Sequence, residues 1–370
     1  MDAFYKKVET LLDLAGISIN GNRPFDIQVH NDQLFQRIFA EGSLGLGEAY
    51  MDGWWDCDAL DEFFYRVTKA NLDRKIKPFR ELGTFLKAAI LNLQHPSRAF
   101  VIGKHHYDIG EDLYETMLDR LMIYSCAYWK KADSLDKAQQ NKLDLVFRKL
   151  GLKKGMRVLD IGCGWGGALK YAVEKFGVKG VGVTVSANQA DKAETICRDL
   201  PVEIHLMDYR DLDEQFDRIW SIGMIEHVGV KNYRTFMRVV RRCLNPEGLF
   251  LLHTIGGNRS VHKSDPWIEK YIFPNSMIPS LRQLALSWED LFVLEDLHNI
   301  GPDYEKTLKH WHQNITSNRN KLIANYSKRF FRMWRYYLMS CAGSFRSRKL
   351  NVWQMVLSPN GIPGGYEPVR

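Results

Sequence analysis

Helix and strand patterns alternate along the chain from about residue 135 to residue 256. Apolar residues at three- and four-residue steps predict four helices, over 135–152, 167–177, 188–200 and 233–244. Short apolar runs between them predict five buried strands, over 156–162, 178–186, 202–208, 216–226 and 248–256. This alternation predicts an α/β fold with a largely parallel sheet and helices on both faces. Ligands of such sheets bind at the carboxyl ends of the strands.

The first 95 residues follow a different pattern. The segment 17–31, "ISINGNRPFDIQVHN", predicts a strand, a turn at Asn20-Gly21 and a second strand. The glycine-rich segment 42–55 follows the helical pattern "DQLFQRIFA" instead of a buried strand, so we interpret it as a structural turn and not as a nucleotide loop. These patterns predict a small, mostly helical α+β domain.

Domain boundaries are predicted from a change in composition near residue 95. A short apolar helix near residue 85 leads into "QHPSRAFVIGKHHYDIG", where proline, glycine and mixed polarity indicate a linker. We therefore expect an N-terminal domain over 1–95, a linker over 96–115 and a larger domain over 116–370.

Composition places the chain among globular proteins. Hydrophobic residues make up 45% and charged residues 26%, and no apolar run reaches the roughly 18 residues that span a bilayer. The sequence "MDAFYKKVET" lacks the features of a signal peptide, so we expect a cytoplasmic location. The cysteines are far apart and form no CxxC pair, which predicts reduced thiols and no structural zinc: Cys57, Cys126, Cys163, Cys197, Cys243 and Cys341.

The positive charge is concentrated near the C-terminal end. The net charge is +7, yet residues 1–95 hold 11 Lys and Arg against 14 Asp and Glu, whereas 317–349 hold nine Lys and Arg and no acid. Apolar side chains from Leu322 to Cys341 recur at helical steps, which predicts an amphipathic helix with a cationic face. That face is either simply solvated or attracted to an anionic surface. A nucleic-acid partner is not expected, because the N-terminal third is acidic and no RNA-recognition motif is evident.

A glycine loop follows the first predicted strand of the larger domain. In "VLDIGCGWGG", 158–167, glycines allow backbone N–H groups to approach a ligand closely. A dinucleotide site would need G-x-G-x-x-G and an acid closing the second strand, but that strand ends "GVTVSANQ". The loop alone leaves a methyltransferase and a dehydrogenase open.

The combination of D-I-G-C-G-W-G-G with T-V-S-A-N-Q resembles the S-adenosylmethionine-dependent methyltransferases of the cyclopropane-fatty-acyl-phospholipid synthase and mycolic-acid cyclopropane synthase family. The resemblance continues through "YSCAYW", "DYRDL", "IEHVG", "LLHTIG", "GPDYEKTL" and "RMWRYYLMSCAGSF", over about residues 100–357. It implies a Rossmann-like class I methyltransferase domain, and it implies that the first 95 residues are the extra N-terminal domain of the bacterial phospholipid enzymes.

The same resemblance implies a set of cofactor contacts. Gly162, Cys163 and Gly164 would face the methionine part of S-adenosylmethionine, with Cys163 interpreted as a small packed residue. Thr184 and Gln189 would bind the ribose region in place of the usual acid. The remaining implied contacts border the adenine and close the pocket: Asp208, Tyr209 and Arg210, and Tyr124 and Ser125.

The chemistry of ring formation requires a base near the methyl group. A double bond that takes the methyl becomes a carbocation, and closing a cyclopropane then releases a proton. Neighbouring Glu226 and His227 stand in "GMIEHVG", but alternation at a strand end would point them apart. Because the next predicted strand ends near His253, we pair Glu226 with His253.

The resemblance implies that a bound bicarbonate ion accepts the proton. Glu226, His253 and Tyr304 would supply side chains to it, and Cys126 and Ile255 would supply mainly backbone contacts. His227 is then interpreted as structural. Cys341 is interpreted as a packed residue with a minor functional share, because the chemistry needs no covalent intermediate.

Other candidates carry less weight. Aromatic rings that could stabilise the cation are Tyr128, Trp129, Tyr271, Phe273 and Trp311, although burial explains most such residues. The pairs His105-His106 and His310-x-His312 lack metal-ligand spacing, so no metal is predicted.

The family implies an unsaturated phospholipid acyl chain as substrate, so we expect an enzyme that works peripherally at the inner face of the membrane. The N-terminal domain and the basic aromatic helix are the expected docking surfaces. A homodimer is kept as a hypothesis for its assembly. The alternative function is a fatty-acyl or other lipid C-methyltransferase that does not close a ring.

Overall fold

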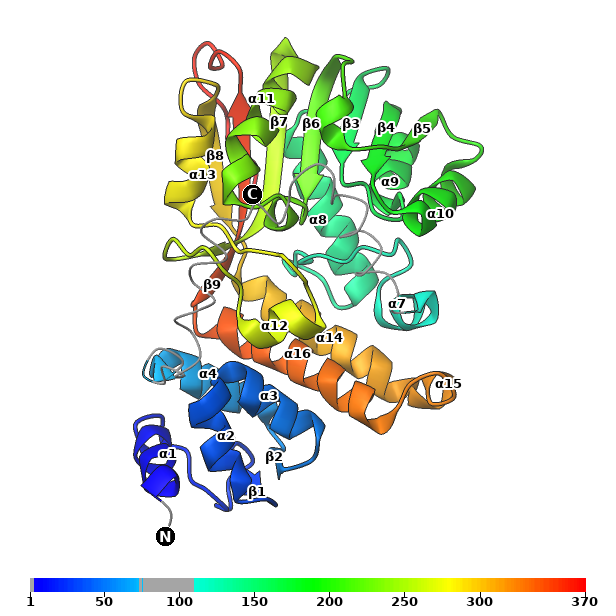
Figure 1. Cartoon of the computed structure of the whole chain (residues 1–370). Helices are drawn as coiled ribbons and strands as arrows, with labels where there is room; N and C mark the ends of the chain where they lie inside the picture. Colours follow the sequence, from blue (N-terminus) through cyan, green and yellow to red (C-terminus); the bar gives the residue numbers. More distant parts are fainter. Residues whose placement is uncertain (1–2, 73–74, 76–109) are drawn as a thin grey trace. The chain divides into compact units, whose positions relative to one another are not determined.

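The computed structural model describes residues 3–72, 75 and 110–370 (Figure 1). The chain divides into two compact units, each built from separate stretches of sequence. One, here called the N-terminal unit, comprises Met1–Asn92, Lys263–Pro274 and Tyr304–Leu350. The other, here called the sheet unit, comprises Leu93–His262, Asn275–Asp303 and Asn351–Arg370.

The sheet unit is built on seven strands in the order β5-β4-β3-β6-β7-β9-β8. The strands are β3 (Arg157–Ile161), β4 (Lys179–Thr184), β5 (Val202–Leu206), β6 (Phe216–Ile222), β7 (Leu244–Gly257), β8 (Val293–Asn299) and β9 (Leu350–Ser358). The first five are parallel, and β8 runs antiparallel to β9. The carboxyl ends of β3 to β7 therefore meet at one edge, where a ligand site is expected.

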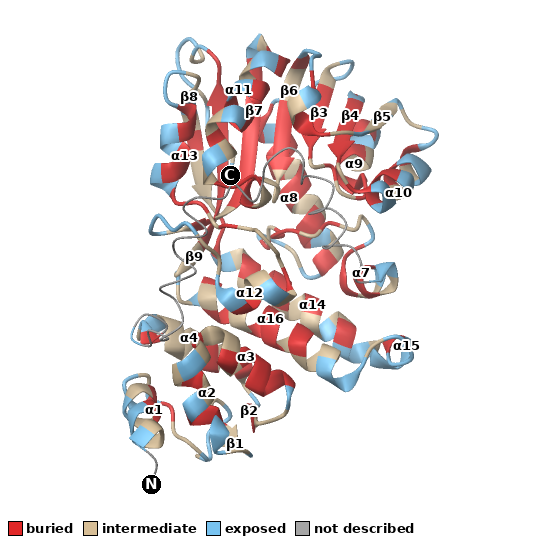
Figure 2. Cartoon of the chain, viewed as in Figure 1, coloured by how far each residue is buried: buried red, intermediate tan, exposed pale blue. Residues whose placement is uncertain are grey.

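Helices cover both faces of this sheet (Figure 1). They are α8 (Leu135–Lys149), α9 (Gly167–Phe176), α10 (Ala187–Cys197), α11 (Tyr233–Cys243) and α13 (Leu281–Trp288). The unit also contains α7 (Glu111–Met117) and the short 3-10 turns η3 (Tyr209–Asp211), η4 (Ile225–His227) and η5 (Val230–Asn232). Alternate residues of β7 enter different cores: Phe250 and Leu252 pack on the α11 side, and Leu249 and Leu251 on the α8 side. Figure 2 shows the central strands buried, whereas the edge strands β5 and β8 are only partly buried, so the strand predicted over 202–208 is not a buried one. The predicted α/β fold with a mostly parallel sheet is confirmed.

The N-terminal unit is mostly helical. Its elements are α1 (Ala3–Asp13), β1 (Gln28–Val29), α2 (Gln33–Glu41), α3 (Ser43–Met51), β2 (Trp55–Asp56), α4 (Leu60–Lys69), α12 (Pro266–Tyr271), α14 (Pro302–Ser317), α15 (Arg319–Leu322) and α16 (Lys328–Arg346). The long helix α16 packs against α3 and α4. Buried aromatic rings hold them together, with Tyr336 of α16 against Trp55 and Phe64.

The basic segment 317–349 does not form one helix. It comprises the single turn α15 and then α16, which begins after Ser327, whose hydroxyl accepts the Phe330 N–H at 3.1 Å. The arginines of α16 bind the acidic N-terminal residues within this unit: Arg329 pairs with Asp52 at 2.8 Å and Arg332 with Asp56 at 2.7 Å. Arg346 pairs with Glu62 at 2.7 Å, whereas Arg335 donates to the backbone carbonyls of Cys57 and Asp58. The opposite charges of the two segments therefore serve packing inside the unit.

Two predictions for the first 95 residues were wrong. Residues 17–31 are not a hairpin, because the Asp26 carboxylate binds the N–H groups of Ser18 and Arg23 and holds the segment as a loop; β1 pairs with β2 instead. The segment 42–55 is not a turn but contains α3. Its glycines permit close packing, since a Cβ at Gly47 would overlap the Trp267 ring.

The predicted domain limits, 1–95, 96–115 and 116–370, are not those of the compact units. Residues 263–274 and 304–350 belong to the unit that holds the N-terminal helices. The short helix predicted near residue 85, the pair His105-His106 and most of the predicted linker lie outside the described residues. Within the described part of the chain, none of the helices combines the length and apolar character that crossing a membrane requires.

Candidate active site

The glycine loop leaves the carboxyl end of β3 open to a ligand. Gly162, Gly164 and Gly166 have φ of 86°, 54° and 82°, in the left-handed region that favours glycine. A Cβ at Gly164 would meet nothing within 4 Å, so backbone is exposed there to an approaching group. Burial raises the pKa of the Cys163 thiol, in accord with a packed and uncharged residue. The loop has the form of a cofactor cradle.

The ends of β4 and β5 bring the other predicted cofactor residues to the same edge. Buried Thr184 donates its hydroxyl hydrogen to Gln189 Oε1 at 2.9 Å, which orients the Gln189 side chain; their contact with the ribose stays a prediction. The Asp208 carboxylate accepts two hydrogen bonds from the Arg210 guanidinium, at 2.8 and 2.6 Å. Tyr209 between them is buried.

The loop that carries Tyr124 and Ser125 is held by a buried lysine. Lys142 of α8 is 0% exposed and donates to Ser125 Oγ at 3.0 Å. Burial lowers the pKa of Lys142 to about 8, although the negative charges of Asp119 and Asp160 act to raise it. Gln139 of the same helix donates to the Ser125 carbonyl at 2.9 Å. Sequence reasoning missed both residues, because polar positions in a helix predict its solvent face.

Glu226 follows β6 in a 3-10 turn and not at the end of the strand. The strand stops at Ile222, Gly223 turns the chain with φ of 71°, and η4 contains Glu226. Strand alternation was therefore the wrong basis for separating Glu226 from His227. The Glu226 Oε1 atom accepts the Ile255 N–H at 2.7 Å, and Oε2 is buried without a hydrogen bond from the described residues. Burial raises the pKa of Glu226 to about 7.

His253 lies on β7, opposite Ile222 in the sheet register. Its side chain is buried, and its Nδ1 lies 3.3 Å from the Gln354 amide nitrogen. Burial, followed by the charges of Lys142 and Lys149, holds the pKa of His253 well below its ordinary value, so the imidazole is neutral. Burial likewise lowers the pKa of His227 to about 4; its structural role stays a prediction.

The two units divide the predicted bicarbonate residues. Cys126, Glu226, His253 and Ile255 belong to the sheet unit, where the Cys126 thiol lies 3.3 Å from the Ala127 carbonyl. Tyr304 belongs to the N-terminal unit, where its ring lies 4.6 Å from that of Phe345. That these five residues form a single bicarbonate site therefore remains a prediction.

Cys341 lies on α16 in the N-terminal unit. Burial raises the pKa of its thiol to about 12, so the thiolate that a nucleophile needs is disfavoured. Among the predicted aromatics, Tyr128 and Trp129 belong to the sheet unit, and Tyr271, Phe273 and Trp311 to the N-terminal unit. No group of three or more His, Cys, Asp or Glu suited to a metal ion occurs among the described residues.

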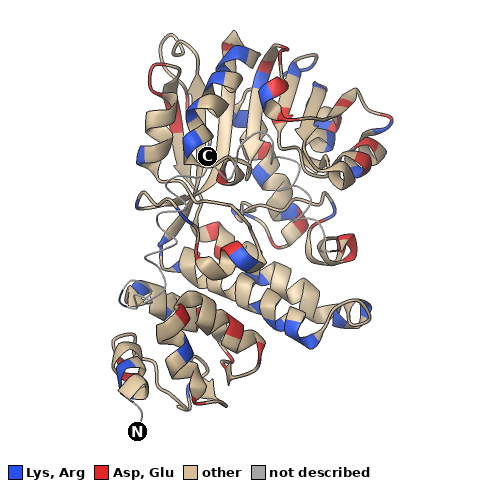
Figure 3. Ribbon diagram, viewed as in Figure 1, with Lys and Arg blue, Asp and Glu red and all other residues tan. Residues whose placement is uncertain are grey.

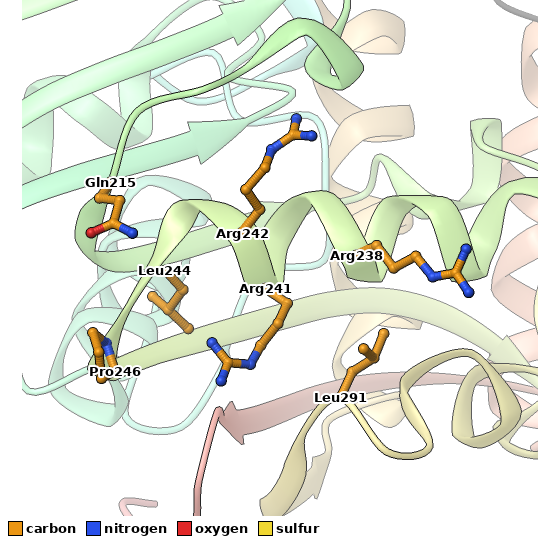
Figure 4. Close-up of a pocket in the computed structure, with 7 residues that line it drawn as sticks. All are labelled: Gln215, Arg238, Arg241, Arg242, Leu244, Pro246 and Leu291. Carbon is orange, nitrogen blue, oxygen red and sulfur yellow. The ribbon is translucent and has the colours of Figure 1, made fainter.

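A cavity of about 430 Å³ lies at the opposite edge of the sheet (Figure 4). Its lining includes Arg238, Arg241 and Arg242 of α11, and Leu244 and Pro246 at the start of β7. Arg242 donates to the Arg210 and Leu212 carbonyls and so helps to hold the loop after η3. The cavity contains none of the predicted site residues and is separate from the cofactor edge.

The strand order and the glycine loop define the fold of an S-adenosylmethionine-dependent methyltransferase. The structure of cyclopropane synthase MmaA2 from Mycobacterium tuberculosis resembles this chain with a TM-score of 0.66 at 31% identity, covering 70% of this chain and 97% of its own. Residues 94–355 match the family described as mycolic acid cyclopropane synthetase, and the chain belongs to that family.

Relatives agree with this assignment. Cyclopropane-fatty-acyl-phospholipid synthase of Escherichia coli K12 is 52% identical over 370 residues, 100% of this chain and 97% of the relative. Cyclopropane mycolic acid synthase 1 of Mycobacterium tuberculosis is 34% identical over 268 residues, 67% of this chain and 93% of the relative. A structure of mycolic acid cyclopropane synthase CmaA1 contains S-adenosylhomocysteine, with a TM-score of 0.65 at 34% identity over 70% of this chain and 97% of that one. The predicted enzyme class, with S-adenosylmethionine as co-substrate, is confirmed.

Proposed function

We propose that this enzyme converts the cis double bond of a phospholipid acyl chain into a cyclopropane ring, with S-adenosylmethionine as the methylene source and bicarbonate as the base. The observation that carries the proposal is similarity along the whole chain: the relative named cyclopropane-fatty-acyl-phospholipid synthase matches all 370 residues, including the N-terminal ones. The mycobacterial relative cited above matches 67% of this chain.

The reaction has two bond-forming steps. The double bond attacks the methyl carbon, the C–S bond breaks, and S-adenosylhomocysteine leaves. A carbocation remains on the acyl chain. The electrons of one methyl C–H bond then form the second ring bond, and the proton passes to a base. The enzyme must therefore hold a proton acceptor beside the methyl group while keeping water away from the cation.

The residues around Glu226 suit a small anion. Because its pKa is raised to about 7, Glu226 is substantially protonated near neutral pH and its carboxylic O–H can donate a hydrogen bond from the otherwise unbonded Oε2. A neutral His253 adds a donor or acceptor without a competing charge. Bound there, bicarbonate would supply the acceptor for the proton. Glu226 and His253 would orient it, with Tyr304 as the third side chain of the proposal.

A second candidate is a C-methyltransferase that leaves a methyl branch. A probable fatty acid methyltransferase of Pseudomonas putida is 34% identical over 267 residues, 68% of this chain and 67% of the relative. The two functions differ in the fate of the cation, because a branch forms when the cation instead loses a proton from a neighbouring carbon of the acyl chain, which leaves the methyl group beside a new double bond. Gas chromatography with mass spectrometry of lipids from cells expressing the protein separates a ring from a branch.

Purified protein tests the role of Glu226 directly. Glu226→Ala should abolish ring formation on detergent-dispersed unsaturated phospholipid, while the dissociation constant of S-adenosylmethionine, measured by calorimetry, stays within a few-fold. Wild-type activity should fall in buffer freed of carbon dioxide and return on adding bicarbonate. Loss of cofactor binding in Glu226→Ala would show that this residue belongs to the cofactor site instead. Full activity without bicarbonate would exclude that ion as the base.

A further inference from the structure

The turn between α14 and α16 exposes an apolar side chain among cations. This segment, residues 318–328, contains the single-turn helix α15 and is here called the hairpin tip. Ile323 at the tip is 58% exposed, whereas its neighbour Leu322 is 1% exposed and anchors the turn. A single exposed aliphatic residue is ordinary on a protein surface, so the residues around Ile323 decide whether it has a role.

Cations flank Ile323 in the sequence of the hairpin tip. Arg319, Lys321 and Lys328 are exposed. The ammonium groups of Lys321 and Lys328 form no ion pair with a described residue. No Asp or Glu occurs anywhere in 317–349. The arginines of the α16 body, in contrast, are paired within the N-terminal unit. Figure 3 shows positive residues at α15 and at the adjoining end of α16.

Aromatic rings form the base of the tip. Tyr326 stacks on Phe330 with centroids 4.4 Å apart, and Phe330 stacks on Trp334 at 5.7 Å. The Arg319 guanidinium lies 4.9 Å from the centre of the Phe331 ring. Half-buried aromatic rings with cations and an exposed aliphatic residue are the composition that favours a membrane–water interface.

Among the described residues, the two other large aliphatic side chains that are more than half exposed lack this setting. Leu14 and Leu286 are 57% and 56% exposed, but Leu14 follows Asp13, and Leu286 lies shortly before Glu289 and Asp290. Acids at these places would be repelled by an anionic surface. The combination of an exposed aliphatic residue, unpaired ammonium groups and no acid distinguishes the hairpin tip from them.

We propose that the hairpin tip docks the N-terminal unit on an anionic phospholipid surface. Ile323 enters the interfacial region, and Lys321 and Lys328 face lipid phosphates. This refines the expected basic-helix docking surface, since the tip and not the body of α16 carries the available charge. The inference rests on the proposed function, in which the substrate is a membrane phospholipid.

Vesicle sedimentation with the full chain tests the proposal. Wild type should bind vesicles of phosphatidylcholine with 30% phosphatidylglycerol, and the combined Lys321→Gln, Lys328→Gln variant should bind about 25-fold more weakly, at about fivefold for each charge. Ile323→Ser should bind about tenfold more weakly, with the salt dependence unchanged. The matched control, Arg238→Gln with Arg241→Gln on α11, removes two cations elsewhere and should bind as wild type. Circular dichroism checks that all variants are folded.

Several results would overturn the proposal. The first is that the tip variants bind vesicles as tightly as the wild type does. The second is that the α11 control loses as much vesicle affinity as the tip variants. The third is that the tip variants lose binding to RNA while they keep binding to vesicles. Activity on detergent-dispersed phospholipid separates this inference from the proposed function. If the tip variants form rings in detergent and also bind vesicles as tightly as the wild type does, the docking inference alone is refuted. A wild type that docks through the tip but forms no ring refutes the proposed function alone.

Discussion

Replacing Glu226 by glutamine should stabilise the protein at alkaline pH while it abolishes ring formation. The folded-state pKa of Glu226 is raised to about 7 from an ordinary 4.5, because its carboxyl is buried and one oxygen lacks a hydrogen bond from the described residues. The amide of the Glu226→Gln variant would still present an oxygen to the Ile255 N–H. It would carry no charge to bury.

The sign and size of this effect follow from proton binding. A raised pKa means that the folded protein binds the proton more tightly than the unfolded chain, so stability present below pH 4.5 is lost as pH rises through 7. At roughly 1.4 kcal/mol for each unit of pKa, the ionised carboxylate costs the folded state up to about 3.5 kcal/mol above pH 7. For a unit of this size, at about 2–4 °C for each kcal/mol, that corresponds to a melting temperature about 7–14 °C higher in Glu226→Gln.

Thermal unfolding of the two proteins between pH 5 and 8.5 measures the effect. The melting temperatures should nearly coincide at pH 5 and separate as pH rises, with the variant the more stable. The exposed substitution Glu203→Gln serves as the control and should show no such divergence. A difference that does not grow with pH, or a variant less stable than wild type at pH 8.5, would refute the reasoning.

Three further substitutions probe the surroundings of the site and the N-terminal unit. Lys142→Met removes the buried donor to Ser125 and should raise KM for S-adenosylmethionine about tenfold, because a hydrogen bond from a charged group contributes about 1.5–3 kcal/mol. A variant with a changed kcat and an unchanged KM would contradict this role. Cys341→Ala should retain kcat within about twofold in a steady-state assay, because a thiol with pKa about 12 is not a nucleophile; a covalent adduct trapped on wild-type Cys341 would contradict this. Arg332→Met should destabilise the N-terminal unit by about 2 kcal/mol in urea unfolding, since the Tyr50 and Trp55 carbonyls lose their donor, whereas exposed Lys328→Met should change little.

The sheet could be predicted from sequence because its signal is local. The strands β3, β4, β6 and β7 contain apolar runs next to helical patterns, and the loop at Gly162 follows the first of them directly. The N-terminal unit could not be predicted as well, because its organisation depends on distant partners. Asn20-Gly21 indicates a hairpin, but the Asp26 carboxylate holds this segment as a loop. Gly47 allows α3 to pack closely against Trp267, a residue more than 200 positions later in the sequence.

The same distinction applies inside the candidate site. Glu226 was identified from its local sequence, but the properties that suit it to the proposed chemistry come from other elements: Ile255 on β7 occupies one carboxyl oxygen, and burial raises the pKa. Lys142 offers no local sign at all, because a lysine on a helix is usually solvated. Its neighbours Asp119 and Asp160 are far from it in sequence, and their pKa values are raised by burial, to about 6 and about 7. Buried ionisable groups at this edge favour an enzymatic site over a purely structural one, because burying them costs stability that packing alone would not require.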